Sequence, residues 1–366
     1  MHRFSALIAS TILSVAAPAS AAGAVPRAFF GVHLDVALIE EGHSFEGQMR
    51  RIARTGAGSI VTSFNWGVDQ QQRGGPVDFT RTDRIVRGAA RSRLRVLPVV
   101  VTSPLWSRPP ELGVFTPPLD PRDYAAYLTA LIGRYGPRGS LWAQEPTLPR
   151  MPIRAWQVWN EPVGGPMADG PSVFWTDSRS RPFQVGYLEL LRAAHAAIKA
   201  ADRGAQVVVA GLVGRSWRSL EILYGAGARP LIDAVSLHPY TGRPADVVRT
   251  VRLVRGVMRR AGAGRVPIML TEVGWPSYAG ELGPEREDLS RTQARWMRAT
   301  LPALVRARRR LGITGLYWYT WMSRDASPDY AFDHAGLVRS EGGRVHGKPA
   351  EGAFRAIVRR ARALPR

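Results

Sequence analysis

Residues 155–162 read AWQVWNEP, and this stretch decides the fold. Aromatic, polar and branched residues alternate as far as Trp159, a pattern that predicts a short strand. Pro162 ends that strand, because proline cannot donate to a sheet ladder. An amide and a carboxylate, Asn160 and Glu161, therefore stand at the carboxyl end of a strand, where α/β proteins place their chemistry.

The same arrangement recurs along the chain as a short apolar run, a loop and an amphipathic segment. The expected strands are residues 29–34, 59–64, 94–101, 153–159, 206–212, 234–237, 267–271 and 313–321. The expected helices are residues 45–55, 79–91, 120–135, 184–200, 218–224, 244–260, 285–310 and 350–363. Several runs are continuously apolar, as in strands buried on both faces. Eight alternations predict an α/β fold, a closed (β/α)8 TIM barrel in a single domain. An open doubly wound sheet is the alternative, but residues 31–35 (GVHLD) lack its glycine-rich phosphate turn.

The first 21 residues have the features of a secretory signal peptide. A weakly basic start, MHR, precedes an apolar run over residues 4–17 and the small-residue cleavage signal ASA at 19–21. That run is too short to cross a bilayer, and no later stretch is long and apolar enough. We therefore expect a secreted, extracellular protein of residues 22–366 without a membrane span. The absence of cysteine excludes disulfides and thiol chemistry.

The chain is strongly basic, with 50 Lys and Arg against 29 Asp and Glu and a net charge of +21. One interpretation is a specific anionic partner. The other is a solvated surface biased towards arginine, with only a loose attraction to anionic cell-surface polymers. The arginines are scattered over several predicted helices and no nucleic-acid-binding motif accompanies them, so we favour the second interpretation and expect no nucleic-acid partner.

The ends of the predicted strands carry the candidate active-site residues, because barrel enzymes place their chemistry there. The polar and aromatic residues at these ends are Trp106, Asn160, Glu161, His238, Tyr240, Glu272, Trp275, Trp318 and Trp321. Two facing carboxylates suit glycosidic bond cleavage, in which a protonated one donates to the leaving oxygen and an ionised one attacks the sugar carbon. Aromatic rings offer flat apolar faces against which sugar rings can pack.

Ordinary structural roles compete with these functional ones. A single strand-end glutamate is usually solvated or ion-paired, an isolated tryptophan is usually core, and His238 alone is more often a structural hydrogen-bonder than a metal ligand. His33 and Asp35 alternate as metal ligands can, but no HExxH or similar cluster accompanies them, so we expect no metal and no cofactor. No GxSxG elbow or phosphate-binding loop is present, which argues against serine hydrolases and nucleotide enzymes.

The motifs in combination resemble clan A glycoside hydrolases, in particular families 39 and 5. They are WNEP at 159–162, HPY at 238–240 and TEVGWP at 271–276, in order and on the expected strands. The resemblance extends over the chain after residue 21, including GKPA at 347–350 before the last helix. It implies a secreted, retaining (β/α)8 catalytic domain with Glu161 as acid/base and Glu272 as nucleophile.

The resemblance also implies roles for the residues around the two glutamates. Asn160 is similar to the residue that binds the hydroxyl next to the reacting carbon. Tyr240 is similar to the partner of the nucleophile, with His238 close by. Trp321 corresponds to the sugar platform of the innermost subsite, with Trp318 as its competitor.

Two departures from the family pattern leave alternatives open. An arginine that often supports the nucleophile is absent from the second predicted strand, where Val61 stands, and Val163 follows Pro162 where relatives often carry asparagine. A catalytically weakened carbohydrate-binding protein therefore remains one alternative, and a protein that binds anionic surfaces through charge alone is another. The choice of poly- or oligosaccharide is expected to depend on the loops at residues 67–77, 107–119, 163–182 and 322–346.

Overall fold

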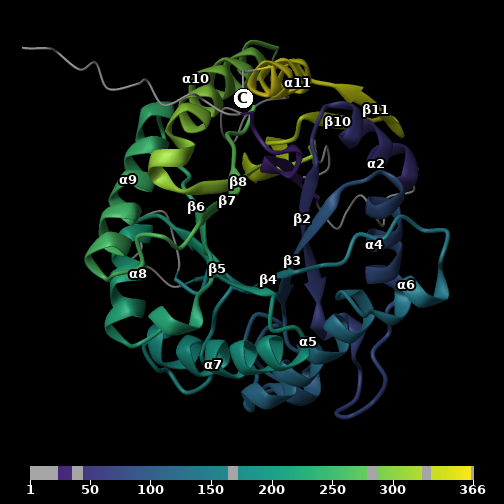
Figure 1. The fold of residues 1–366 in the computed structure, drawn as a ribbon, viewed down its shortest axis with the longest axis vertical. Helices are drawn as coiled ribbons and strands as arrows, with labels where there is room; N and C mark the ends of the chain where they lie inside the picture. The colour runs from purple at the N-terminus through teal and green to yellow at the C-terminus, as the bar shows by residue number, and fades with distance from the viewer. Residues whose placement is uncertain (1–23, 35–43, 164–171, 278–286, 324–330, 364–366) are drawn as a thin grey trace, which may run out of the picture.

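The computed structural model describes residues 24–34, 44–163, 172–277, 287–323 and 331–363. Eight parallel strands form a closed barrel in chain order, which confirms the predicted (β/α)8 fold (Figure 1). They are β1 (Phe30–His33), β2 (Ser59–Asn65), β3 (Arg95–Val101), β4 (Ala155–Asn160), β5 (Gln206–Val213), β6 (Val235–His238), β7 (Ile268–Val273) and β8 (Ile313–Trp318). The predicted signal peptide and Asp35 lie outside the described residues.

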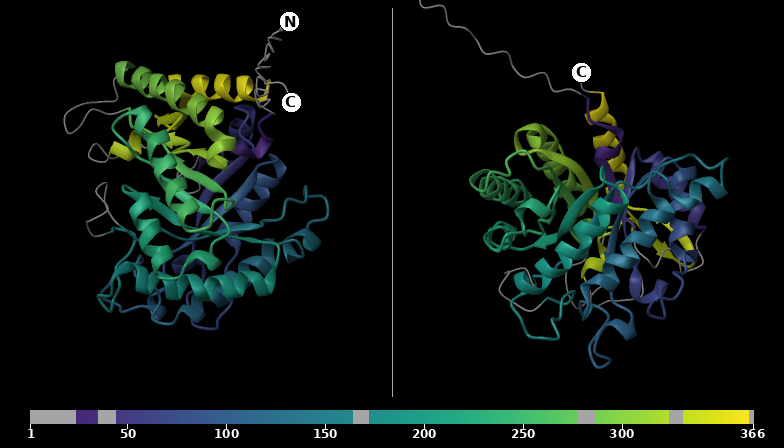
Figure 2. Two further views of the ribbon diagram at one scale, coloured as in Figure 1. Left: turned by 60° about the vertical axis from the view of Figure 1, so that its left-hand side comes forward. Right: turned by 60° about the horizontal axis from the view of Figure 1, so that its bottom comes forward.

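The helices surround the barrel, as Figure 1 and the two views of Figure 2 show. The longer ones are α2 (Phe45–Arg54), α4 (Thr80–Arg91), α5 (Pro121–Tyr135), α7 (Phe183–Ala201), α8 (Ser216–Gly225), α9 (Pro244–Arg260), α10 (Glu287–Leu311) and α11 (Pro349–Arg362). Among the described residues, no helix combines the length and apolar composition that crossing a membrane requires.

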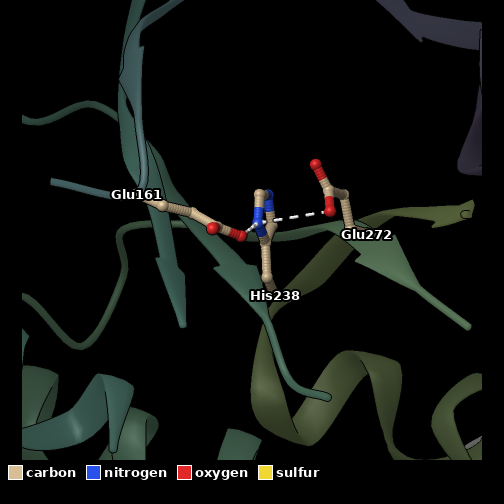
Figure 3. A group of neighbouring side chains, drawn as sticks. All are labelled: Glu161, His238 and Glu272. Atoms are coloured by element: carbon tan, nitrogen blue, oxygen red, sulfur yellow. Dashed lines mark hydrogen bonds and ion pairs between the residues drawn. The ribbon is translucent and has the colours of Figure 1, made fainter. Parts of the chain in front are cut away.

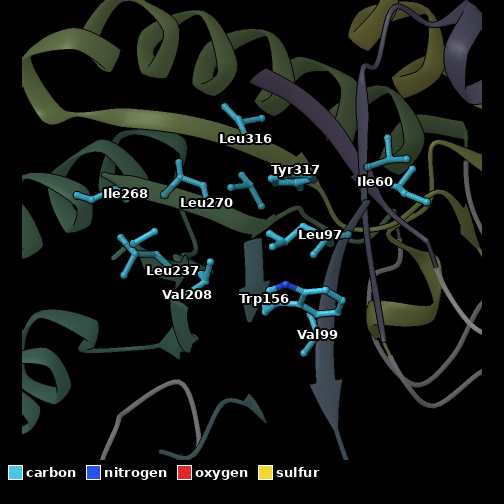
Figure 4. Packing of buried hydrophobic residues seen from close by; sticks show 14 of the residues in the cluster. Ile60, Leu97, Val99, Trp156, Val208, Leu237, Ile268, Leu270, Leu316 and Tyr317 are labelled. Atoms are coloured by element: carbon cyan, nitrogen blue, oxygen red, sulfur yellow. The ribbon is translucent and has the colours of Figure 1, made fainter. Parts of the chain in front are cut away.

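Local sequence explains much of this arrangement. Asp120 caps α5 by accepting a hydrogen bond of 2.9 Å from the Arg122 backbone N–H, and Pro121 occupies the first helical position, where its missing N–H costs nothing. The strands are largely apolar on both faces because one face meets the helices and the other the barrel interior. Figure 4 shows this packing, with Leu97, Trp156 and Leu316 from three different strands in one cluster.

The structure corrects three details of the predicted elements. α8 is a helix of 10 residues rather than the shorter segment expected, and β8 ends at Trp318 instead of continuing to residue 321. Residues 322–346 are not only a loop, since β9 (Met322–Ser323), β10 (Val338–Glu341) and β11 (Arg344–Gly347) form a small sheet. Its hairpin turns at Gly342 and Gly343, whose φ angles of 56° and 73° favour glycine and the primed hairpin turns.

A cavity opens at the amino-terminal end of the barrel, opposite the end where the strands finish. Arg95, Arg150 and Arg154 line it together with the base of the barrel, including Tyr317. Arg154 pairs with Asp202 at 3.2 Å. The lining itself contains no acidic side chain.

Candidate active site

Three side chains converge where β4, β6 and β7 end. Glu161 directly follows β4, His238 is the last residue of β6, and Glu272 is the next-to-last residue of β7. The His238 ring stands between the two carboxyl groups (Figure 3). Its Nδ1 lies 2.5 Å from Glu161 Oε1 and 3.5 Å from Glu272 Oε2. One donor atom from each of the three side chains lies within 4.8 Å of the other two, so the predicted pair of glutamates does meet.

Glu272 is buried among polar partners, with 8% of its surface exposed. The Tyr240 hydroxyl donates a hydrogen bond of 2.6 Å to Glu272 Oε2. Burial, and then the charge of Glu272, raises the pKa of Tyr240 well above its usual value, so the phenol remains a donor. A donor of this kind favours the ionised form of the carboxylate.

His33 lies beside the place where the family pattern has arginine. Val61 is fully buried on β2 and pairs in register with His33 on β1. The Nε2 atom of His33 lies 3.8 Å from Glu272 Oε1. The neighbouring strand thus brings an imidazole to the nucleophile candidate from the side where Val61 offers only methyl groups.

His238 is buried, with 1% of its surface exposed. Burial alone lowers its pKa, but the charges of Glu272 and Glu161 and the hydrogen bond to Glu161 outweigh burial, so that the pKa of His238 is raised. The ring fits because β5 carries Gly211 opposite it. A Cβ atom at residue 211 would lie 2.2 Å from His238 Nε2.

The backbone at the end of β4 is turned sharply to present Glu161. Trp159 and Glu161 have φ angles of 67° and 36°, in the left-handed region that side chains other than glycine rarely adopt. Two contacts from the following loop hold this turn. The Trp159 indole N–H donates to the Phe174 carbonyl at 2.6 Å, and the Ser172 hydroxyl donates to the Glu161 carbonyl. Asn160 is half-buried beside them.

Three of the four predicted tryptophans are in the core. Trp318 and Trp321 are fully buried, and their indole N–H groups donate to the Ala335 carbonyl at 2.9 Å and to Gln48 Oε1 at 3.1 Å. Trp275 is buried as well. Sugar stacking needs an exposed ring face, so the structure offers no platform at these positions. Trp106 is half-buried.

Two aromatic residues next to His33 and Tyr240, the neighbours of Glu272, were not among the predicted site residues. Tyr319 and Phe332 are half-buried, and their ring centroids lie 6.0 Å apart. The Tyr319 ring lies 4.8 Å from that of His33, and the Phe332 ring lies 4.8 Å from that of Tyr240. The aromatic run at the end of the last predicted strand contained a signal for Tyr319, whereas Phe332 follows a segment with no periodic pattern.

The loops after β3 and β4 also meet through aromatic rings. Phe115 and Phe174 are in edge-to-face contact at 4.9 Å. In the described part of the loop after β4, Val163 and Trp175 are buried and Phe174 is half-buried.

The donor set of Glu161, His238 and Glu272 resembles a metal site in composition. Two ligands of one zinc ion, each at about 2.0–2.1 Å from it, lie well over 3 Å apart in tetrahedral geometry. The 2.5 Å between His238 Nδ1 and Glu161 Oε1 is a hydrogen-bond distance instead. This geometry suits a shared proton better than a shared metal ion.

Comparison with known proteins finds similarity in structure only. No protein-family model matches the chain, and no curated protein matches it. A family 39 glycoside hydrolase from Bacteroides cellulosilyticus WH2 is 18% identical with a TM-score of 0.70, over 93% of this chain and 64% of that one. A family 39 β-xylosidase from Caulobacter crescentus is 17% identical with a TM-score of 0.64, over 92% and 72%.

Further solved structures share the same architecture. A family 5 protein (GH5_18) from Streptomyces cattleya, solved with GlcNAc, is 18% identical with a TM-score of 0.62, over 94% of this chain and 83% of that one. A rice β-glucosidase is 14% identical with a TM-score of 0.65, over 92% and 99%. This chain spans less than two thirds of the first two solved structures, 64% and 60% of their lengths. What the chain shares with these proteins is therefore the (β/α)8 fold.

Proposed function

We propose that the chain is a retaining glycoside hydrolase that cleaves O-glycosidic bonds of a poly- or oligosaccharide by double displacement. The observation that carries the proposal is the convergence of Glu161 and Glu272, with an oxygen of one within 4.8 Å of an oxygen of the other. Carboxyl groups about 5–5.5 Å apart are typical of retaining enzymes, whereas inverting enzymes need about 6.5–9.5 Å. The close spacing favours retention.

Each glutamate has a distinct role in this mechanism. In the first step, Glu161 donates its proton to the leaving-group oxygen, that C–O bond breaks, and a Glu272 oxygen forms a bond to the sugar carbon. In the second step, water attacks the same carbon, Glu161 accepts a proton from the water, and Glu272 leaves as a carboxylate. The hydrogen bond from Tyr240 to Glu272 supports this assignment, because a nucleophile must be ionised.

The residues around the glutamates suit a sugar. Asn160 precedes Glu161 and offers an amide for a hydroxyl group, as the family pattern implies. The half-buried rings of Trp106, Tyr319 and Phe332 offer apolar faces at the same end of the barrel.

A catalytically weakened carbohydrate-binding protein is the second candidate, and Val61 in place of arginine favours it. The position of His33, 3.8 Å from Glu272, weakens that argument because an imidazole stands near the carboxylate instead. The two candidates differ in turnover and not in binding, so kinetics distinguish them.

Replacement of the two glutamates tests the roles directly. We expect Glu272→Gln to abolish hydrolysis in a screen over plant, fungal and bacterial polysaccharides, because an amide cannot form the covalent intermediate. We expect Glu161→Gln to lower kcat by about 10²–10⁴-fold on natural substrates. Its effect on aryl glycosides with activated leaving groups should be much smaller, since these need little proton donation.

Covalent labelling supplies the control. A fluorinated glycoside of an accepted sugar should label Glu272 in the native protein and fail to label Glu272→Gln. Normal sugar binding with neither turnover nor labelling would support the binding-protein alternative. Hydrolysis that survives Glu272→Gln would refute the nucleophile assignment.

We also propose that the chain is exported and that residues 1–21 are removed. The amino-terminal sequence pattern supports this proposal. Mass spectrometry of protein from the culture medium should find a mature chain that begins at residue 22. Recovery of the full-length chain from inside the cell alone would contradict it.

A further inference from the structure

A chain of buried polar side chains runs through the barrel interior beneath the two glutamates. Gln157 on β4, Ser236 on β6 and Thr271 on β7 are each 0–1% exposed. Ser236 Oγ donates to Gln157 Oε1 at 3.0 Å, and Ser236 Oγ and Thr271 Oγ1 share a short hydrogen bond. Thr271 Oγ1 then lies 3.0 Å from His238 Nε2. Three strands thus connect their interior side chains to the ring that separates the glutamates.

The orientation of the Gln157 amide determines the direction of each hydrogen bond from Gln157 through Ser236 and Thr271 to His238. Gln157 Nε2 faces two acceptors, the Trp159 carbonyl at 3.2 Å and Asn160 Oδ1 at 3.4 Å. Because a carbonyl oxygen only accepts, the amide nitrogen of Gln157 must lie on that side and its oxygen must face Ser236. The single hydroxyl proton of Ser236 is therefore used on Gln157.

The remaining protons are then determined by elimination. Since Ser236 has no proton left, the short bond between the two hydroxyls requires Thr271 to donate to Ser236. Thr271 can only accept from His238, so His238 Nε2 must carry a hydrogen. Neutral His238 is consequently the Nε2–H tautomer, and its bare Nδ1 points at Glu161 Oε1 from 2.5 Å.

This tautomer constrains the protonation of Glu161. An ionised Glu161 beside a neutral His238 would set one lone pair against another at 2.5 Å, a distance too short for a water molecule to lie between the two atoms. One proton must therefore lie between the two atoms, on Glu161 when His238 is neutral and on Nδ1 when His238 is charged. The opposite tautomer would donate to Glu161 and stabilise its ionised form, which cannot act as an acid.

We propose that the Gln157–Ser236–Thr271 chain acts as a positioning device that fixes the Nε2–H tautomer of His238 and so keeps Glu161 supplied with the proton that it donates. The tautomer follows from geometry alone, while its catalytic meaning rests on the proposed function. After Glu161 has given up its proton, the same mismatch with Nδ1 makes its carboxylate a better base for the attacking water.

Other titratable groups around the ring do not replace this arrangement. Glu272, on β7, places its Oε2 atom 3.5 Å from His238 Nδ1, and the Tyr240 ring lies 6.3 Å from the His238 ring. His33 approaches Glu272 at its other oxygen, Oε1. Both carboxylates face Nδ1, while Nε2 faces Thr271.

Nitrogen NMR of the histidine rings tests the tautomer without any assay of activity. In protein labelled with ¹⁵N-histidine, the His238 signals are assigned with His238→Gln. We expect Nε2 to carry a hydrogen across the whole pH range. In Thr271→Val, which keeps the shape but removes the acceptor, the neutral ring should change to the Nδ1–H tautomer. Thr271→Ser should restore the native signals.

Two further variants serve as a second test and as a control. Ser236→Ala frees the Thr271 proton and should produce the same tautomer change, which covers the case that Thr271→Val does not fold. Thr62→Val is the matched control, because Thr62 is an equally buried barrel threonine whose hydroxyl donates to the Leu34 carbonyl, away from the chain. It should leave the His238 signals and the activity unchanged.

Kinetics supply the second measurement. In Thr271→Val the Nδ1–H tautomer would donate to Glu161 and favour its ionised form, so Glu161 should lose its proton at lower pH. The basic limb of the kcat/KM profile should therefore move down by about one pH unit, and Thr271→Ser should reverse the shift. An unchanged tautomer and an unchanged pH profile in an active Thr271→Val would overturn this inference and leave the proposed function standing. The expected tautomers in a protein that hydrolyses no glycoside would instead refute the proposed function.

Discussion

At the scale of single residues, the structure contains a buried acid that the sequence pattern did not reveal. Asp69, at the end of α3 (Trp66–Asp69), is 3% exposed and accepts a hydrogen bond of 2.6 Å from Tyr127. Burial raises its pKa to about 6, despite the opposing effect of Tyr127. A folded-state pKa above the unfolded value means that stability falls as pH rises from about 4 to about 6. We expect Asp69→Asn to be more stable than the native protein at pH 7.5, by up to about 3 kcal/mol, and similar to it at pH 4. Urea unfolding at the two pH values measures this difference.

The matched control is the neighbouring exposed acid, Asp78. Its pKa is lowered by hydrogen bonds from the side chain and backbone of Thr80, so its contribution to stability is present above the unfolded pKa and lost at low pH. Asp78→Asn should therefore destabilise the protein at pH 7.5 and have less effect at pH 4, the opposite sign to Asp69→Asn. Equal changes at both pH values for Asp69→Asn would contradict the assignment.

At the scale of elements, Lys348 joins the start of α11 to the loops that follow β7 and β8. Its buried ammonium donates to Ser277 Oγ at 2.6 Å, to Ser323 Oγ at 3.1 Å and to the His334 carbonyl at 2.9 Å. Hydrogen bonds to a charged group are individually strong, so Lys348→Met should lower the free energy of unfolding by about 2 kcal/mol. Amide exchange in residues 331–338 should accelerate, because this tie holds that segment to the barrel.

The only other lysine in the chain provides the comparison. Lys199 pairs with Asp233 at 2.6 Å but its side chain is 26% exposed. Lys199→Met should cost no more than about 1 kcal/mol and leave exchange at residues 331–338 unchanged. Equal effects of the two variants on that segment would show that Lys348 has no special role there.

At the scale of the whole molecule, the charge of +21 is spread widely, and the cavity at the amino-terminal end of the barrel is one place where arginines gather. We propose only a loose attraction to anionic polymers, so binding to them should weaken steeply between low and physiological salt while sugar hydrolysis changes little. Arg95→Gln combined with Arg150→Gln should reduce this binding no more than Arg249→Gln combined with Arg252→Gln, which removes the same charge from α9. A much larger loss from the first pair would indicate a specific anion site in the cavity.

Much of the molecule could be predicted because its signals are local. The Asp120-Pro121 start of α5, the apolar strands and the two strand-end glutamates depend on neighbours in sequence. The burial of Trp321 against Gln48 and the position of His33 beside Val61 depend on register between distant segments, which composition does not encode. The hairpin at Gly342-Gly343 also has a local signal, because a Gly-Gly pair favours a tight hairpin turn, although residues 322–346 were expected to be a loop.

The hydrogen bonds of Lys348 also set an order of events in a newly made chain. Strands β1 to β8 all precede residue 319, so the barrel can close while the end of the chain is still being synthesised. The loops beside Glu272 gain their anchor only when Lys348 follows. A nascent chain would thus bring its two glutamates together before the loops around them are fixed in place.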